Sequence, residues 1–141
     1  MTNNASPART LRGQCLCGAV QYEVDDAFEY ALNCHCSNCR RATGSAFKPF
    51  GGVKLEKLKL LSNPSTLMIY GGDDAHDVHC KRCGSLLYSA FPPRAYAHIT
   101  FGTLIDTPSL LPTAHIFVGS KAPWFEILDK LPQHHEFPPE E

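Results

Sequence analysis

Seven cysteines are the residues of this 141-residue chain whose type and spacing indicate chemistry. They form three groups: Cys15-Leu16-Cys17, Cys34-His35-Cys36-Ser37-Asn38-Cys39 and Cys80-Lys81-Arg82-Cys83. The polar N-terminal sequence carries no secretion signal, and an odd count would leave one cysteine unpaired, so a disulfide framework is disfavoured. Closely spaced cysteines are typical of zinc sites instead, where thiolates bind the ion tetrahedrally at about 2.3 Å.

The first and last groups together predict a closed, structural zinc site. They supply a full tetrahedral set: Cys15, Cys17, Cys80 and Cys83. Each pair is followed by a glycine, Gly18 or Gly84, which suits a tight turn because glycine tolerates positive φ. A zinc ion held in this way would clip together two segments that are far apart in the sequence, and the long loop adds only a modest entropic cost.

The central group predicts a second, open zinc site. Cys34, Cys36 and Cys39 supply three ligands, and a free fourth position is typical of a catalytic zinc ion. Thiolates donate charge strongly, so such an ion activates water poorly. It is better suited to capturing the soft sulfur of a substrate thiol, which it would hold as a thiolate.

Several interpretations of the central group remain open from the residues alone. His35, His79 or His98 could close the site as a fourth ligand and make it structural. The cysteines could be buried apolar residues. Cys36 and Cys39 could instead form a redox-active C-x-x-C pair.

Two arginines, Arg40 and Arg41, directly follow the last cysteine of the central group. A guanidinium group here could balance the negative charge of a thiolate site or bind a substrate carboxylate through two parallel hydrogen bonds. A solvated helix face explains the same two residues equally well.

Short strands separated by turns must position these cysteines, so we predict a mostly β domain with short helical turns. Val20, Tyr22 and Val24 alternate with their neighbours at the period of a half-buried strand. Expected elements are a hairpin over 11–24 and strands over 28–32, 47–53, 66–70, 85–90, 96–100 and 115–118. A helical segment is expected over 37–43, with Ser37 as N-cap and Gly44 as C-cap.

Length and composition indicate one globular domain. We place it at residues 11–133, between a disordered tail over 1–10 and a C-terminal tail over 134–141. Hydrophobic residues make up 43% and charged residues 19% of the chain, and the net charge of −1 gives no basis for binding nucleic acid or an anionic membrane. No apolar run approaches the roughly 18 residues of a membrane span, and we expect a cytoplasmic protein.

The cysteine groups and their surroundings resemble the glutathione-dependent formaldehyde-activating enzyme family. The matching segments are 13–22, 34–40, 44–45, 80–85, 115–118 and 129–132, with Lys121 and Trp124. The resemblance implies an Mss4-like zinc fold, a structural zinc on the outer pairs and a catalytic zinc on the central three cysteines. It also implies the condensation of formaldehyde with glutathione to S-hydroxymethylglutathione, an activity of the carbon–sulfur lyase class.

The sequence therefore predicts an enzyme with two zinc ions that binds a small thiol, glutathione first, and adds it to, or releases it from, formaldehyde or a related carbonyl. A competing hypothesis is a non-enzymatic zinc scaffold or thiol carrier. A thiol-redox enzyme similar to methionine sulfoxide reductases fits less well, since one pair is C-x-C and a three-cysteine cluster intervenes. The sequence leaves the oligomeric state open.

Overall fold

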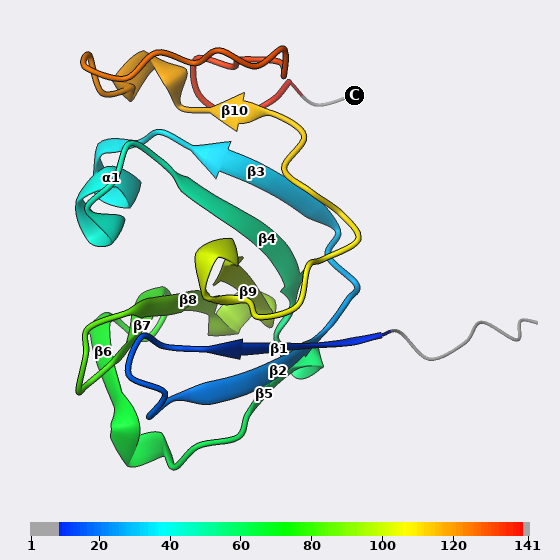
Figure 1. Ribbon diagram of the computed structural model, residues 1–141, viewed down its shortest axis with the longest axis vertical. Helices are drawn as coiled ribbons and strands as arrows, with labels where there is room; N and C mark the ends of the chain where they lie inside the picture. Colours follow the sequence, from blue (N-terminus) through cyan, green and yellow to red (C-terminus); the bar gives the residue numbers. More distant parts are fainter. Residues whose placement is uncertain (1–8, 140–141) are drawn as a thin grey trace, which may run out of the picture.

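Residues 9–139, which the computed structural model describes, form two β-sheets, one short α-helix and several 3₁₀ turns (Figure 1). The smaller sheet has the order β1 (Thr10–Gln14), β2 (Gln21–Asp25), β5 (Leu58–Leu60). The larger sheet has the order β10 (His115–Ile116), β3 (Tyr30–Cys34), β4 (Lys48–Lys54), β9 (Tyr96–Thr100), β8 (Leu86–Phe91), β7 (His76–Cys80), β6 (Leu67–Gly71). The helix α1 is Ser37–Thr43. The predicted mostly β class is confirmed.

The hydrophobic core forms where the two sheets meet. Tyr22 and Val24 of β2 point into it, and Val53, Leu87 and Ile99 of the larger sheet meet them there. Along each of these strands, every second side chain points into this core, because successive side chains of a strand point to opposite faces of the sheet. The second face of the larger sheet therefore carries a separate set of side chains, and the central cysteines lie at its edge.

Two differences from the predicted elements concern the strands around the third cysteine group and the last strand. β7, which ends at Cys80, was not expected, because its sequence His-Asp-Val-His-Cys shows little apolar alternation. β10 is shorter than expected: it ends at Ile116, since Phe117 adopts a positive φ of 55° and turns the chain. In the described part of the chain, no helix is long and apolar enough to cross a membrane.

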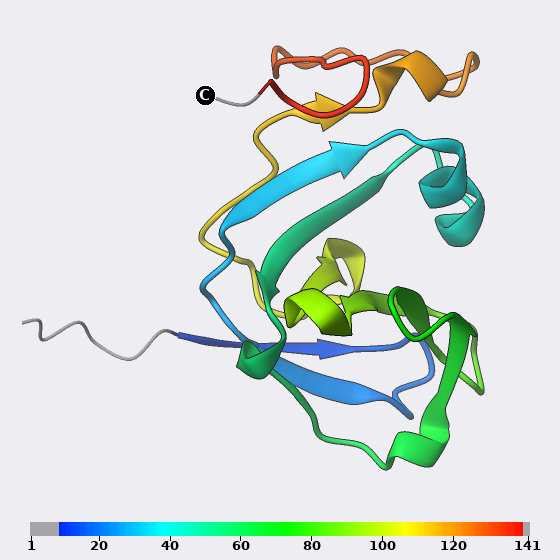
Figure 2. The ribbon, with the colours of Figure 1, turned by 180° about the vertical axis from the view of Figure 1, so that it is seen from behind.

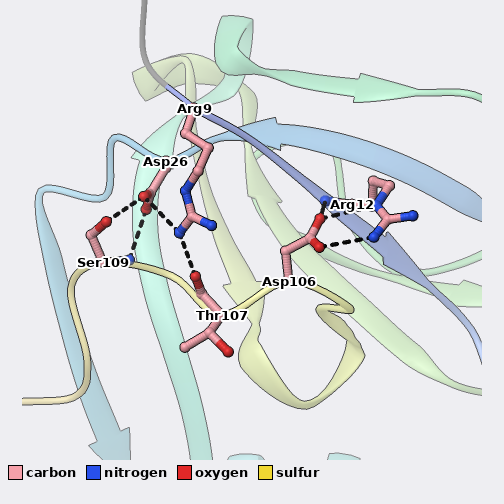
Figure 3. A network of polar contacts seen from close by, with 6 residues as sticks. All are labelled: Arg9, Arg12, Asp26, Asp106, Thr107 and Ser109. Carbon is pink, nitrogen blue, oxygen red and sulfur yellow. Dashed lines mark hydrogen bonds and ion pairs between the residues drawn. The ribbon is translucent and has the colours of Figure 1, made fainter.

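A network of ion pairs ties the connection between β9 and β10 to the smaller sheet (Figure 3). The Arg12 guanidinium donates to both carboxylate oxygens of Asp106, at 3.0 and 3.1 Å, and the Arg12 backbone N–H donates to the same group. Asp26 accepts from the Arg9 guanidinium at 3.2 Å and from the Ser109 backbone N–H at 3.0 Å. These contacts fix a long connection that has little secondary structure of its own.

The segment after β10 runs back along that strand at the edge of the larger sheet (Figures 1 and 2). The backbone N–H of His115 donates to the Pro132 carbonyl at 2.8 Å, and the backbone N–H of Phe117 donates to the Glu136 carbonyl at 2.9 Å. Within the segment expected as a C-terminal tail, backbone hydrogen bonds hold residues 134–136 against 115–119. At the other end, Thr10 belongs to β1 and residues 1–8 lie outside the described residues.

Candidate metal centres

The four outer cysteines converge as predicted. The sulfur atoms of Cys15, Cys17, Cys80 and Cys83 all lie within 4.8 Å of one another. A tetrahedral site with zinc–sulfur bonds of about 2.3 Å places its sulfurs about 3.8 Å apart. The Cys15–Cys17 and Cys17–Cys80 sulfur distances are 3.7 and 3.8 Å. The donor set therefore fits a four-coordinate zinc ion in both chemistry and spacing.

Two tight turns form the outer cluster. Gly18 and Gly84 have φ values of 82° and 84°, so both predicted glycine turns are confirmed. The turns also point backbone N–H groups at the sulfurs: Val20 donates to Cys15 at 3.2 Å, and Cys83 donates to Cys80 at 3.4 Å. Such donors stabilise thiolates.

Ser85 joins the two turns of the outer cluster. Its hydroxyl accepts from the Leu16 backbone N–H at 2.9 Å and lies 3.2 Å from the Cys83 sulfur. Hydrogen bonding by Ser85 lowers the pKa of the Cys83 thiol to about 5. This thiol is consequently ready to bind a metal as a thiolate near neutral pH.

The central cysteines occupy the corner between β3 and α1. Cys34 ends β3, Cys36 precedes the helix, and Cys39 lies in its first turn, with all three sulfurs within 4.8 Å of one another. The predicted N-cap is off by one residue: the Cys36 sulfur, rather than Ser37, accepts from the Cys39 N–H at 3.2 Å. The predicted C-cap at Gly44 is confirmed. A metal ion bound here would thus use the same sulfur that caps the helix.

A buried lysine accompanies the central cysteines. Lys48 is paired with Cys34 in the β3–β4 register, and cross-strand partners share a face of the sheet. Only 7% of Lys48 is exposed, and its ammonium group lies 5.6 Å from the centre of the Phe50 ring. Hydrogen bonding between Cys34 and Cys39 lowers the pKa of Cys34 and raises that of Cys39, and the Lys48 charge opposes the rise. The sequence analysis missed Lys48, because its position opposite Cys34 depends on strand register.

A hydrogen-bonded chain that runs from the buried His35 through the buried His115 to the exposed Asp129 holds His35 away from the role of metal ligand. His35 Nε2 lies 2.8 Å from His115 Nδ1, and His115 Nε2 lies 2.9 Å from the Asp129 carboxylate. Since the carboxylate accepts from His115 Nε2–H, His115 Nδ1 accepts in turn from His35 Nε2–H. Burial, followed by the charge of His115, lowers the pKa of His35 to about 4. The sequence analysis missed these hydrogen bonds, because His35 and His115 are 80 residues apart and His115 and Asp129 are 14 residues apart.

The suggested closure of the central site by histidine is not borne out within residues 9–139. His35, His79 and His98 do not join the group of converging ligand atoms, which contains three cysteines alone. The His79 ring bonds to the Gly84 carbonyl at 3.1 Å, and the His98 ring lies 2.6 Å from the Tyr30 hydroxyl. The described part of the chain therefore supplies three donors to this site.

The two arginines of α1 lie in different surroundings. Arg40 is half-buried, and its charge contributes to lowering the pKa of His35. Arg41 is exposed and lines a hollow of about 590 Å³ between the helix and the end of the larger sheet. The hollow is also lined by Asn38, Ala42, Met68, Tyr70, Asp77 and His79. Neither arginine forms an ion pair within the described residues.

Comparison with known proteins gives the family. The sequence pattern of the glutathione-dependent formaldehyde-activating enzymes matches residues 10–120. A Halomonas elongata protein with the name "Putative glutathione-dependent formaldehyde-activating enzyme" is 30% identical over 136 residues, which covers 83% of this chain and 80% of that protein. The chain belongs to the glutathione-dependent formaldehyde-activating enzyme family.

Two further proteins are similar to this chain. An uncharacterized lyase of Schizosaccharomyces pombe is 29% identical over 79 residues, which covers 56% of each chain. The crystal structure of a Rhodobacter sphaeroides protein superimposes with a TM-score of 0.57 and 25% identity, covering 70% of this chain and 91% of that one. Both predicted cysteine clusters thus occur in a chain whose family and fold agree with the sequence analysis.

Proposed function

We propose that this protein is a zinc-dependent enzyme of the carbon–sulfur lyase type, which adds glutathione to formaldehyde or releases it from the adduct. The observation that carries the proposal is the convergence of Cys34, Cys36 and Cys39 as a set of three donors. Zinc bound by three thiolates would hold a substrate thiol as its fourth, soft ligand. Family membership supports the choice of glutathione and formaldehyde.

The protein's own groups would assist in two ways. Lys48 places a buried positive charge beside the thiolates, which offsets part of the negative charge that a fourth sulfur adds. Arg41, at the edge of the hollow next to α1, is a candidate to hold a carboxylate of glutathione. Arg40 is the weaker candidate, since it is partly covered beside His35.

The reaction requires no electron transfer. The thiol sulfur forms a bond to the carbonyl carbon, the π electrons of the carbonyl move to its oxygen, and that oxygen takes up one proton. In the reverse direction the carbon–sulfur bond breaks and the thiol is released.

Cobalt substitution tests the thiol site directly. Titrating the cobalt-loaded protein with glutathione should strengthen the sulfur-to-cobalt charge-transfer band as a fourth sulfur binds. S-methylglutathione, which cannot form a thiolate, should leave the band unchanged. The C39S variant should lose the glutathione response, whereas C83S, if it folds, should retain it. Equal responses to both compounds, or none to either, would favour the non-enzymatic zinc scaffold.

A further inference from the structure

The larger sheet ends at β6, and this edge differs from the other sheet edges of the molecule (Figure 1). The β10 edge is covered by the C-terminal segment, to which His115 and Phe117 donate backbone hydrogen bonds. The β1 edge is covered by the connection between β9 and β10, where the Ile105 N–H donates to the Arg12 carbonyl. β5 is three residues long and carries the exposed Lys59 at its centre. Short length, charge and covering segments all prevent a sheet edge from pairing with another strand.

β6 has none of these protections within the described residues. Its sequence, Leu-Met-Ile-Tyr-Gly, contains no charged residue and no proline. Met68, Ile69 and Tyr70 are 42, 51 and 72% exposed. Apart from the turn that leads into the strand, no segment of residues 9–139 hydrogen-bonds to its outer side. An uncharged, apolar edge of this kind is open to pairing with another strand.

The backbone groups of Ile69 point away from the rest of the sheet. At the two ends of the β6–β7 pair, the Lys81 N–H donates to the Thr66 carbonyl and the Gly72 N–H donates to the Ala75 carbonyl. Antiparallel strands exchange hydrogen bonds at every second residue, so the even-numbered residues of this segment direct their backbone groups towards β7. The N–H and C=O of Ile69 therefore face outwards, where a further strand would bind them.

The two ends of β6 carry opposite charges. Asp73 and Asp74 follow its C-terminal end, whereas Lys81 and Arg82 lie beside its N-terminal end, where Lys81 bonds to Thr66. All four charged side chains are exposed, and none forms an ion pair within the described residues. An antiparallel partner strand of the same sequence would bring opposite charges together at both ends, whereas a parallel one would bring like charges together. Exposed charges of this kind add little affinity but select the orientation.

We propose that β6 pairs with β6 of a second copy of this chain, antiparallel and about a two-fold axis at Ile69, so that the larger sheets of the two copies become one. The two Ile69 residues then exchange both backbone hydrogen bonds. Met68 lies opposite Tyr70 of the partner subunit, and a thioether beside an aromatic ring is a favourable contact. The assembly closes at a dimer, because a two-fold interface uses the same edge of both copies. Dimer formation does not depend on the proposed function.

The second copy would also extend the hollow next to α1. Met68 and Tyr70 line that hollow together with Arg41. They occupy alternate positions of β6 and therefore face the same side of the sheet. In the joined sheet the partner's Met68 and the partner's Tyr70 lie beside them on this side. The second copy thus contributes apolar side chains to the surface beside Arg41.

Sedimentation velocity of the zinc-loaded protein tests the dimer. Between about 5 and 200 µM the wild type should change from a monomer of 15.6 kDa towards a dimer, since an interface of one strand per copy belongs to the small, weak class. I69K should weaken association about tenfold or more, because two ammonium groups meet at the axis. I105K is the matched control, since Ile105 is also 51% exposed, and should associate like wild type. A monomer throughout, or a dimer that I69K leaves unchanged, would overturn the proposal.

Hydrogen exchange identifies the strand that pairs. In the dimer the Ile69 N–H donates across the axis, so NMR should show its exchange slowing several-fold as the protein concentration rises. The Met68 N–H, which faces β7, should be protected at every concentration. Dimers in which Ile69 exchanges as fast as in the monomer would mean that the copies meet at another surface.

Charge reversal tests the antiparallel orientation. D73K/D74K puts like charges at both ends of the interface and should weaken association several-fold. Salt screens exposed charges, so adding it should weaken the wild-type dimer and strengthen that of the variant. Unchanged or tighter association of D73K/D74K at low salt would contradict antiparallel pairing.

Discussion

The two cysteine clusters use the same side chain in different structural settings. The outer cluster takes Cys15 from the turn after β1 in the smaller sheet and Cys80 from the end of β7 in the larger one. The central cluster takes all its ligands from the β3–α1 corner. A metal in the outer cluster therefore joins two sheets, whereas one in the central cluster holds a short local segment that the helix cap also supports.

This difference predicts which of the two metal sites stabilises the fold. Cys17 and Cys80 are 63 residues apart, so bringing their sulfurs together closes a long loop, and the free energy of metal binding becomes part of the folding free energy. The central cysteines span a few residues, and closing that segment contributes little. The outer site should be structural, and the central site is free to exchange its fourth ligand.

The largest expected effect is that of C80S. Removing a buried outer ligand should lower the midpoint of thermal unfolding by about 10 °C or more, because the two sheets lose their metal link. The matched variant is C36S, which should lower it by only a few degrees, since serine is a good N-cap and can take over from the Cys36 sulfur. Differential scanning calorimetry of both zinc-loaded variants makes the comparison. Equal large losses would make both sites structural and remove the main support for an enzyme.

Chelator treatment should separate the two metals in time. We expect two zinc ions per chain, of which one is released early from the central cluster and one late from the outer cluster. A vacant coordination position gives a chelator direct access to the central ion. Zinc release followed with a chromophoric chelator should show two phases, and C36S should lack the early one. A single phase of one zinc ion in wild-type protein prepared with zinc would contradict the open site.

Sequence reasoning predicted the clusters well because their information is local. The spacing within each cysteine group and the glycines after Cys17 and Cys83 specify metal-binding turns without knowledge of the fold. Lys48 and the Asp129–His115–His35 chain could not be found in this way. Their relation to the central cysteines arises from strand register and from a segment that folds back along β10, and neither leaves a periodic signal in the sequence. The domain boundaries and the roles of the arginines stay predictions.

Lys48 offers a smaller effect that is confined to the central cluster. K48M should weaken zinc binding at that cluster about tenfold, because the thiolates lose a buried positive charge beside them. Thermal stability should change little, since methionine replaces the buried stem and removes a costly buried charge. Competition with a chelator of known affinity measures the early-released zinc. K54M is the control, because Lys54 lies on the same strand but is exposed at its far end. Equal affinity of the K48M and K54M variants would show that the lysine does not interact with the metal site.

The prediction with the smallest expected effect concerns the Arg12–Asp106 ion pair. It measures how much this ion pair, compared with the outer metal ion, stabilises the contact between the smaller sheet and the rest of the molecule. Hydrogen bonds from the Arg12 side chain and backbone lower the pKa of Asp106 from its ordinary 3.8 to about 2. A carboxyl with a lowered folded-state pKa stabilises the fold fully above its unfolded-state value of about 3.8 and loses this contribution as the pH falls towards 2. D106N should therefore lower the thermal midpoint by about 1 to 3 °C, an amount that stays constant between pH 7 and 5 and shrinks below pH 4.

Calorimetry of wild type and D106N across this pH range gives the difference directly, so acid effects on the thiolates, which both proteins share, cancel. D73N, at an exposed aspartate without a hydrogen bond among the described residues, should match wild type throughout. A D106N loss as large as that of C80S would mean that the ion pair of Figure 3, rather than the outer metal, is the main connection between the smaller sheet and the rest of the molecule. A loss that persists unchanged below pH 3 would instead assign the effect to the hydrogen bond that the Arg12 backbone donates, which the neutral side chain of asparagine would then fail to replace.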